Sequence, residues 1–312
     1  MSRTRTHTLD ASQVHYAWDN ALPPRLEIEP GDEVVFQTRD AADGYYTPQS
    51  TAEDVRRRVF PGHPLTGPVW VKGARPGHVL EVEIRAVEPG AWGWTAIMPG
   101  RGLLPHDFSE PYLHKWDLSR RDVALLRPDI AIPIEPFCGI LGVALATPGP
   151  HSTMPPRENG GNMDVKQLTA GTTLYLPVQV EGALFSCGDA HAAQGDGEVC
   201  LTAIETTATV TLRFRLHDTF TIREPQFRTA GPLGGCPNTG PYYATTAFHT
   251  DLLEAARNAV RYMIDHLVRT RGLSREEAFV LCSVAVDLRI SEVVDAPHWI
   301  VTAFLPESIF RG

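Results

Sequence analysis

Four ionisable side chains lie close together in residues 188–198, a segment that directly follows an apolar run. Asp189 and His191 are two residues apart, and Asp196 and Glu198 repeat that spacing. In extended backbone, side chains two residues apart share a face, so each pair points one way. The glycines of the segment permit a reversal that would bring all four groups to one point. Such a convergence suits zinc, and hard oxygen ligands also suit calcium. The alternative is a solvated turn whose carboxylates cap backbone N–H groups.

The elements that would position this loop are predicted to be short β-strands. Residues 79–87 alternate apolar and charged side chains, which is typical of a half-buried strand. Residues 174–180 and 207–216 carry the same period, and residues 25–36 suggest two strands around a Pro-Gly turn. Many short strands with glycine and proline turns predict a mainly β fold, either a sandwich or a distorted barrel.

The pattern changes to a helical one near the C-terminal end. Residues 251–269 place apolar side chains at helical spacing and predict an amphipathic helix that Gly272 ends. Ser274 and Glu277 have the form of a capping box and predict a second helix to about residue 286. Residues 299–305 predict a final strand that returns to the sheet.

We therefore expect one domain over residues 1–312 with a C-terminal helical (α+β) portion. A soft boundary near residue 245 separates a β-rich part, 1–245, from a helix–helix–strand part, 246–312. The second part is too small to be independent.

Composition excludes several classes of function. The chain has 37 acidic against 28 basic residues, a net charge of −9, and no basic stripe with aromatic residues, so nucleic acid is not an expected partner. It has no apolar run of about 18 residues, so we expect no membrane span. The five cysteines form no C-x-x-C pair. The polar start contains no secretory signal pattern, which predicts a cytoplasmic protein.

Several motifs give the chain a wider resemblance. They are HPLTGP at 63–68, PFCG at 136–139, HSTMPP at 151–156, GGNMD at 160–164, DLRIS at 287–291 and the loop at 188–198. With these motifs the sequence resembles the acetamidase/formamidase family over nearly its whole length. The resemblance implies a mainly β fold, hydrolysis of short amides to a carboxylate and ammonia, bound divalent metal and a homo-oligomer, for which we favour a dimer. A glycine-rich insertion at 231–240 departs from the family and could reshape a pocket edge.

Amide hydrolysis needs a nucleophile, stabilisation of the oxyanion and a proton for the leaving amine. A divalent cation would serve the first two needs, because it lowers the pKa of bound water to roughly 7 and polarises the carbonyl. We expect Asp164, Asp189 and His191 to bind it, with zinc the first expectation and calcium the alternative. The assignment of Asp164 as a ligand depends mainly on the resemblance to the family. Glu198 is the expected general base and acid, although it could equally be a ligand.

Two further histidines lie in stiff, proline-containing segments. His151 is a candidate catalytic residue that could orient the substrate or bind a second metal, although lone histidines are more often structural. His63 opens the HPLTGP turn, where a structural role is the safer interpretation and a metal or substrate role the lesser one.

Four side chains are candidate substrate contacts. His15 and Trp18 form an amphipathic cluster near the N-terminus that could line the pocket, although a buried aromatic plug is an equal alternative. Asn162 lies in the GGNMD motif, where a simple turn is the alternative, and Gln194 lies in the 188–198 loop.

Other mechanisms have weaker support. Cys187 directly precedes the loop, but no Glu and Lys arrangement accompanies it, so we expect a small buried residue rather than a nucleophile. A non-catalytic β-sandwich that binds metal and a ligand or partner stays an alternative function. A hydrolase of the same fold acting on a larger or cyclic amide is another.

Overall fold

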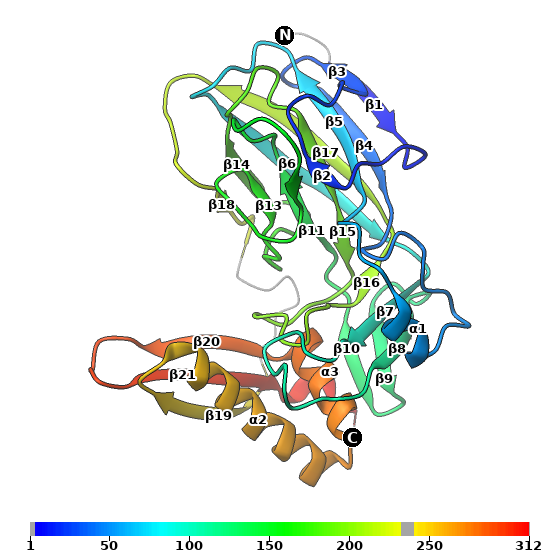
Figure 1. Ribbon diagram of the computed structural model, residues 1–312, viewed down its shortest axis with the longest axis vertical. Helices are drawn as coiled ribbons and strands as arrows, with labels where there is room; N and C mark the ends of the chain where they lie inside the picture. The colour runs from blue at the N-terminus through cyan, green and yellow to red at the C-terminus, as the bar shows by residue number, and fades with distance from the viewer. Residues whose placement is uncertain (1–3, 232–239, 312) are drawn as a thin grey trace.

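Two open β-sheets pack face to face in the upper part of Figure 1, and one of them continues to the lower right. The figure shows a computed structural model that describes residues 4–231 and 240–311. One sheet has the strand order β1 (Thr6–Leu9), β4 (Glu33–Thr38), β17 (Ala208–His217), β6 (Val79–Pro89), β14 (Thr173–Pro177) and β18 (Gln226–Arg228). The other has the order β13 (Gly160–Asn162), β11 (Phe137–Gly142), β15 (Phe185–His191), β16 (Glu205–Thr206), β7 (Trp92–Ile97) and β8 (Tyr112–Asp117).

Smaller elements extend these sheets. Strand β5 (Leu65–Val71) pairs with β15, and β3 (Leu26–Ile28) pairs with β5. Two short ladders join β2 (Ala17–Trp18) to β12 (His151–Ser152) and β9 (Val123–Arg127) to β10 (Ile130–Pro133). The short helices are α1 (Ala52–Arg57) and the 3₁₀ turn Glu307–Ile309.

A hydrophobic core fills the space between the two sheets. Phe36 and Phe214 from the first sheet contact Phe185 of the second with ring centroids 5.9 and 5.0 Å apart. The alternating burial of β6 and β17 places their apolar side chains in this core and their charged side chains outside. The predicted β-sandwich is confirmed, and the distorted barrel is not, because neither sheet closes on itself.

The C-terminal part, which we call the C-terminal unit, lies in the lower part of Figure 1 and shares a buried cluster with residues 97–132 and 192–204. It consists of β19 (Tyr242–His249), α2 (Leu252–Arg271), α3 (Arg275–Ala285), β20 (Asp287–Glu292) and β21 (Trp299–Pro306). Both predicted helices are confirmed. The side chain of Asp251 caps α2, Gly272 ends it in the left-handed conformation with φ 61°, and the predicted capping box opens α3.

The final strand differs from the prediction. Strand β21 does not return to the sandwich but pairs with β19 on one side and β20 on the other, in a separate three-stranded sheet. The apolar pattern of residues 299–305 predicts a strand but not its neighbours. Among the described residues, no helix is both long and apolar enough to cross a membrane.

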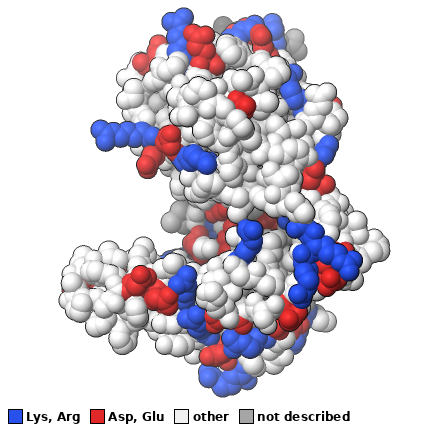
Figure 2. Space-filling model, viewed as in Figure 1, with Lys and Arg blue, Asp and Glu red and all other residues white. Residues whose placement is uncertain are grey.

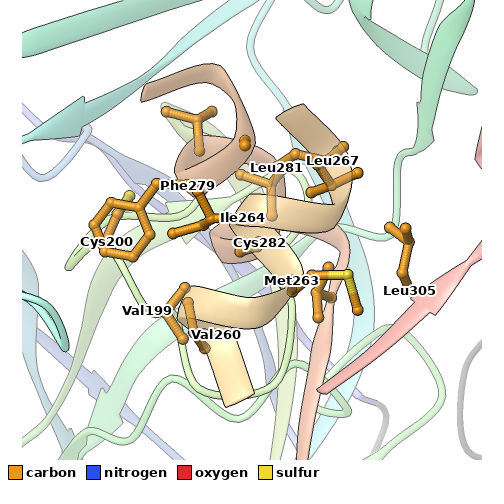
Figure 3. Close-up of a cluster of buried hydrophobic side chains, with 14 of the residues drawn as sticks. Val199, Cys200, Val260, Met263, Ile264, Leu267, Phe279, Leu281, Cys282 and Leu305 are labelled. Carbon is orange, nitrogen blue, oxygen red and sulfur yellow. The ribbon is translucent and has the colours of Figure 1, made fainter. Parts of the chain in front are cut away.

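Helices α2 and α3 also hold the loop that follows β15. Figure 3 shows Val199 and Cys200 packed with Val260, Ile264 and Phe279 in one cluster of buried side chains. Val199, the residue after Glu198, is therefore held in the buried cluster of α2 and α3. Backbone bonds strengthen the attachment, since the N–H of Gly195 donates to the Ser283 carbonyl at 2.9 Å.

Candidate metal centre

Strand β15 carries Asp189 and His191 at its C-terminal end. His191 Nε2 lies 3.5 Å from Asp189 Oδ1, so the predicted convergence of this pair is confirmed. Asp189 adopts the left-handed conformation with φ 55°, which breaks the regular alternation of the strand. The two residues are only 3% and 1% exposed, which excludes the solvated turn as the explanation for them.

Glu205 is a third member of this group and was not predicted. Strand β16 pairs with β15 in a register that places Glu205 opposite His191, and its Oε2 lies 3.2 Å from His191 Nε2. Glu205 is 2% exposed. A lone glutamate followed by two threonines carries no motif, so only the strand register reveals it.

Asp164 and Glu198 complete a carboxylate–imidazole cluster. Ligand atoms of Asp164, Asp189 and His191 lie within 4.8 Å of one another, as do those of His191, Glu198 and Glu205. We call these five residues the cluster. Asp164 and Glu198 are also left-handed, with φ 48° and 42°. Such conformations cost of order 1–3 kcal/mol each and persist where the surroundings enforce them.

Gly139 on β11 leaves the space that the cluster needs. A Cβ at this position would lie 2.4 Å from Asp164 Oδ1 and 2.9 Å from the Cε1 of His191. Only glycine fits here without displacing Asp164 or His191, which explains the glycine of the PFCG motif.

Asp196 does not join the cluster, so the prediction that all four loop groups meet is wrong for this residue. Its Oδ1 accepts from the Gln167 amide at 3.3 Å, and its backbone N–H donates to Asp287. The reversal after Gly195 turns Asp196 toward the C-terminal unit, where Leu288 N–H also bonds its carbonyl.

Gln194 lies behind His191 and fixes its ring. Gln194 Oε1 lies 2.9 Å from His191 Nδ1, while the Gln194 amide nitrogen donates to the Asp164 carbonyl at 2.7 Å. Because Gln194 Oε1 can only accept, Nδ1 carries a proton, and Nε2 is the ring nitrogen that faces the carboxylates. This is how metal-binding histidines are commonly oriented.

His63 approaches the cluster from the HPLTGP turn. Its Nδ1 lies 3.0 Å from Thr153 Oγ1, and its Nε2 lies 3.8 Å from Asp189 Oδ2. The imidazole is buried, and burial lowers its pKa. The lesser of the two sequence interpretations, a metal or substrate role, therefore has geometry that supports it.

The electrostatics of the cluster reflect negative charge placed away from water. Burial raises the pKa of Asp164 and of Glu205 to about 7. Burial and the charge of Asp164 raise the pKa of Glu198 well above its usual range. Burial opposes the charge of Asp189, but the imidazoles of His63 and His191 outweigh it and lower that pKa.

The donor atoms of the cluster fit a cation. Among the buried side-chain atoms of the described residues that have no hydrogen-bond partner, four lie together in the cluster: Asp164 Oδ1, Asp189 Oδ1, His191 Nε2 and Glu205 Oε2. Unpaired buried polar atoms are rare in folded proteins because each costs roughly 1–3 kcal/mol. Carboxylate oxygens with imidazole nitrogen are the donor set of zinc, manganese and iron sites.

The other predicted site residues belong to neither of the two groups of ligand atoms. His151 Nε2 donates to the Thr147 carbonyl at 2.9 Å. His15 uses both ring nitrogens, with Ala17 O and Ser186 Oγ each at 2.8 Å. Trp18 is buried against Leu65 and Ile140, as the plug alternative predicts, and its Nε1 has no partner.

Asn162 occupies β13, two residues before Asp164. Its amide nitrogen donates to the Met154 carbonyl at 3.0 Å, and its Oδ1 is buried without a partner. Cys187 is fully buried, and burial raises the pKa of its thiol well above the usual value, as expected of a core residue. Residues 232–239 of the insertion lie outside the described part of the chain.

A cavity of about 600 Å³ adjoins the loop. Gln194 forms part of its wall, together with Lys166 and Asp196, and the C-terminal unit supplies Asp287 and Arg289. Figure 2 shows the molecule hollowed between the sandwich and the C-terminal unit.

Comparison with known proteins finds a family model, a sequence relative and solved structures that are similar to this chain. The model of the acetamidase/formamidase family matches residues 1–150 and 145–312. A formamidase of Methylophilus methylotrophus is 27% identical over 96% of this chain and 90% of its own. A gamma lactamase from Delftia acidovorans has a TM-score of 0.89 at 27% identity, covering 97% of this chain and 93% of its own. An acetamidase from Bacillus halodurans has a TM-score of 0.69 at 31% identity, covering 96% of each chain.

Proposed function

This chain belongs to the acetamidase/formamidase family, and from that premise we propose that it is an amide hydrolase whose cluster binds a divalent metal ion. The substrate is a short linear amide of the formamide or acetamide type, which water converts to a carboxylate and ammonia. The relatives named formamidase and acetamidase support this reaction. They give no support to the alternative of a binding module without turnover.

The observation that carries the metal role is the set of unpaired donor atoms. Asp164, Asp189, His191 and Glu205 each present a buried atom with no hydrogen-bond partner to a common space. A metal bound there would polarise a carbonyl and lower the pKa of water. The mixed oxygen and nitrogen donors favour zinc, and calcium, which prefers oxygen ligands alone, is the weaker alternative.

Glu198 is the proposed general base and acid. Its carboxyl belongs to the same group of ligand atoms as His191 and Glu205, where a bound cation would keep it ionised and able to accept a proton. In the reaction it takes a proton from the attacking water and passes it to the leaving nitrogen, so that the C–N bond breaks to give ammonia. Gln194 keeps the His191 ring in place during these transfers.

The test compares ammonia release and metal content in two variants. Glu198→Gln should keep its metal and lose turnover by roughly 10²–10⁴-fold, as expected when a general base is removed. His191→Ala should lose both metal and turnover. The matched control is Glu181→Gln, the same change at an exposed position. Full turnover in Glu198→Gln would show that Glu198 takes no part in the reaction. Undiminished turnover in metal-free protein would show that the reaction needs no metal.

A cyclic amide is the second candidate substrate. The backbone is closer to the gamma lactamase, with a TM-score of 0.89, than to the acetamidase, with 0.69. The cavity of about 600 Å³ beside the loop is also far larger than formamide needs. Parallel assays with formamide, acetamide and a five-membered lactam separate the two candidates. A kcat/KM highest for the lactam would favour the cyclic substrate.

Self-association and a cytoplasmic location are further parts of the proposal. Large apolar side chains are exposed on the C-terminal unit, among them Phe248, Ile290 and Val294, and support a homodimer. The four described cysteines are buried and unpaired, which is compatible with a reducing compartment.

A further inference from the structure

We propose that Trp18 and Asn162 bind the amide group of the substrate beside the cluster, Trp18 through its indole N–H and Asn162 through its side-chain oxygen. We call these two residues the amide pair. An amide whose C=O and N–H point to the same side satisfies both at once. This inference rests on the hydrolase function proposed above and names its substrate class: primary amides and small lactams, as opposed to open-chain secondary amides.

Two unpaired polar atoms carry the inference. Trp18 is 1% exposed, and among the described residues its Nε1 has no hydrogen-bond partner. Asn162 donates its amide nitrogen to the Met154 carbonyl at 3.0 Å, so the atom that stays buried without a partner is its oxygen, Oδ1. One of the two atoms is a donor and the other an acceptor. Buried polar atoms without partners are rare because they are costly.

The strand register brings the two side chains to one place. Asn162 of β13 pairs with Ile140 of β11, and side chains directly opposite each other in an antiparallel pair lie on the same face. Ile140 in turn belongs to the same group of buried side chains as Trp18. The amide pair therefore lies over one residue of β11, although its members are 144 positions apart in the sequence.

The indole is held with its N–H end nearer to Asn162. A Cβ on Gly142 would lie 2.9 Å from Cη2 of Trp18, whereas a Cβ on Gly161, the residue before Asn162, would lie 3.4 Å from Nε1. The His15 ring packs edge-on against the indole with centroids 6.4 Å apart. A donor that is fixed before the substrate arrives costs less to use in binding.

The amide pair is adjacent to the cluster. The residue of β11 next to the partner of Asn162 is Gly139, where a Cβ would lie 2.4 Å from Asp164 Oδ1 and 2.9 Å from His191 Cε1. Neighbouring residues of a strand are about 3.4 Å apart along it. Asn162 and Asp164 are both half-buried, so this side of the cluster keeps contact with solvent. An amide bound by the pair therefore has the proposed metal ligands beside it.

The donor and the acceptor select the geometry of the amide. The substrate oxygen accepts from Trp18 Nε1, and the substrate N–H donates to Asn162 Oδ1. A primary amide has one N–H on the same side as its C=O, and the ring of a small lactam enforces that arrangement. An open-chain secondary amide has them on opposite sides, and its cis form is disfavoured roughly 70-fold. Both candidate substrates of this chain, a short linear amide and a cyclic one, therefore fit.

Substrate preference tests the inference. Acetamide, a five-membered lactam and N-methylacetamide are compared by kcat/KM, with the products measured by chromatography. Wild type should prefer acetamide to N-methylacetamide by about tenfold or more, and Asn162→Leu should lose about tenfold for acetamide and for the lactam. N-methylacetamide, which makes no bond to Oδ1 in its trans form, should change little, and the metal content should stay the same.

The matched control is Asn20→Leu. Asn20 also donates its amide nitrogen to a backbone carbonyl, that of Leu145 at 2.9 Å, so the control removes a similar bond and should leave the preference unchanged. A preference that is also unchanged in Asn162→Leu, as it would be if an ordered water alone joined the two atoms, would overturn the inference.

Nuclear magnetic resonance gives a second readout that needs no turnover. The indole N–H signal of Trp18, identified by its loss in Trp18→Phe, should shift when wild type is titrated with acetamide. The signal of Trp116, which donates to Thr95 Oγ1 at 2.9 Å, should not. If no indole signal moves at saturation, the inference is wrong, whether or not Trp18→Phe folds. A shifted Trp18 signal without amide hydrolysis refutes the proposed function alone, and hydrolysis without the shift refutes the amide pair alone.

Discussion

At the scale of single residues, Gln194 shows how a neighbouring side chain orients a proposed metal ligand. The sequence suggests a substrate contact for this side chain, whereas its two polar atoms are both engaged, one with His191 Nδ1 and one with the Asp164 carbonyl. A side chain used in this way positions two of the proposed ligands and leaves His191 Nε2 free.

Replacing Gln194 with methionine should therefore weaken metal binding. The change keeps the size of the side chain but removes both hydrogen bonds, and loss of such supporting contacts typically costs 10–100-fold in metal affinity or activity. Competition titration with a chromophoric chelator measures the effect. Gln179→Met is a control, since Gln179 bonds the Ala146 backbone N–H outside the cluster. An unchanged metal affinity in Gln194→Met would show that the ring needs no support.

Glu205 gives the sharper prediction, because nothing in the sequence marks it. Glu205→Gln keeps the shape but removes the charge opposite His191, at a side chain that is 2% exposed. We expect the metal affinity to fall by roughly tenfold or more, with ammonia release falling in parallel. Metal retained at wild-type affinity would place the cation elsewhere.

The sequence predicted part of this site and the register of the strands supplied the rest. The two-residue spacing predicted that Asp189 and His191 meet, although Asp189 is left-handed rather than extended. The same spacing was misleading for Asp196, because Gln167 and Asp287 hold that residue on the other side of the loop. Glu205 depends on a pairing between β15 and β16 that local sequence does not encode.

At the scale of elements, the cluster depends on contacts between the sandwich and the C-terminal helices. Val199 and Cys200 lie in the same buried group as α2 and α3 (Figure 3), directly after Glu198. A Cβ at Gly195 would lie 2.1 Å from the Val286 carbonyl, so the loop and the end of α3 are in close contact. The helices thereby hold Glu198 at the cluster.

A charged pair adds to this attachment and gives a pH-dependent prediction. Asp107 accepts two bonds from Arg261 of α2, at 2.8 and 2.9 Å, and these bonds lower the Asp107 pKa. A carboxyl whose pKa is lower in the folded state stabilises above its unfolded pKa and loses this contribution as pH falls through the folded pKa.

Asp107→Asn should thus lower the free energy of unfolding by about 1 kcal/mol at pH 7, and the difference from wild type should shrink below about pH 4. Urea unfolding at pH 7 and pH 3 measures it. Asp265→Asn is the control, because the Asp265 side chain is 61% exposed and its pair with Arg275 should contribute little. A difference that persists at pH 3 would mean that the carboxylate charge is not its cause.

Local signals predicted the helices of this unit better than its sheet. Gly272 and the Ser274–Glu277 box were predicted to mark helix ends through bonds within a few residues, and both were confirmed. Strand β19 lies tens of residues before β21 in the sequence. Apolar composition alone could therefore not identify β19 as a strand that pairs with β21.

At the scale of the whole molecule, the C-terminal sheet projects from the sandwich (Figure 1), and its projecting end is mostly uncharged on the face in Figure 2. Val294, Phe248 and Ile290 there are 81%, 67% and 60% exposed. An uncharged surface can meet its own copy without repulsion, even though the chain carries a net charge of −9.

Val294→Asp should therefore convert a dimer to a monomer. A charge within an apolar contact must lose water when the contact forms. Light scattering coupled to size-exclusion chromatography gives the mass. Val59→Asp, at an 85% exposed position in the loop after α1, is the control that should stay dimeric. A wild type that is monomeric at high concentration would contradict the proposed homodimer.

Anomalous diffraction from crystals grown without chelators tests the central claim most directly. Data collected above and below the absorption edge of the metal locate it, identify the element and reveal its ligands together. We predict anomalous density between Asp189, His191 and Glu205. A fully loaded crystal with no peak among these side chains would contradict the account.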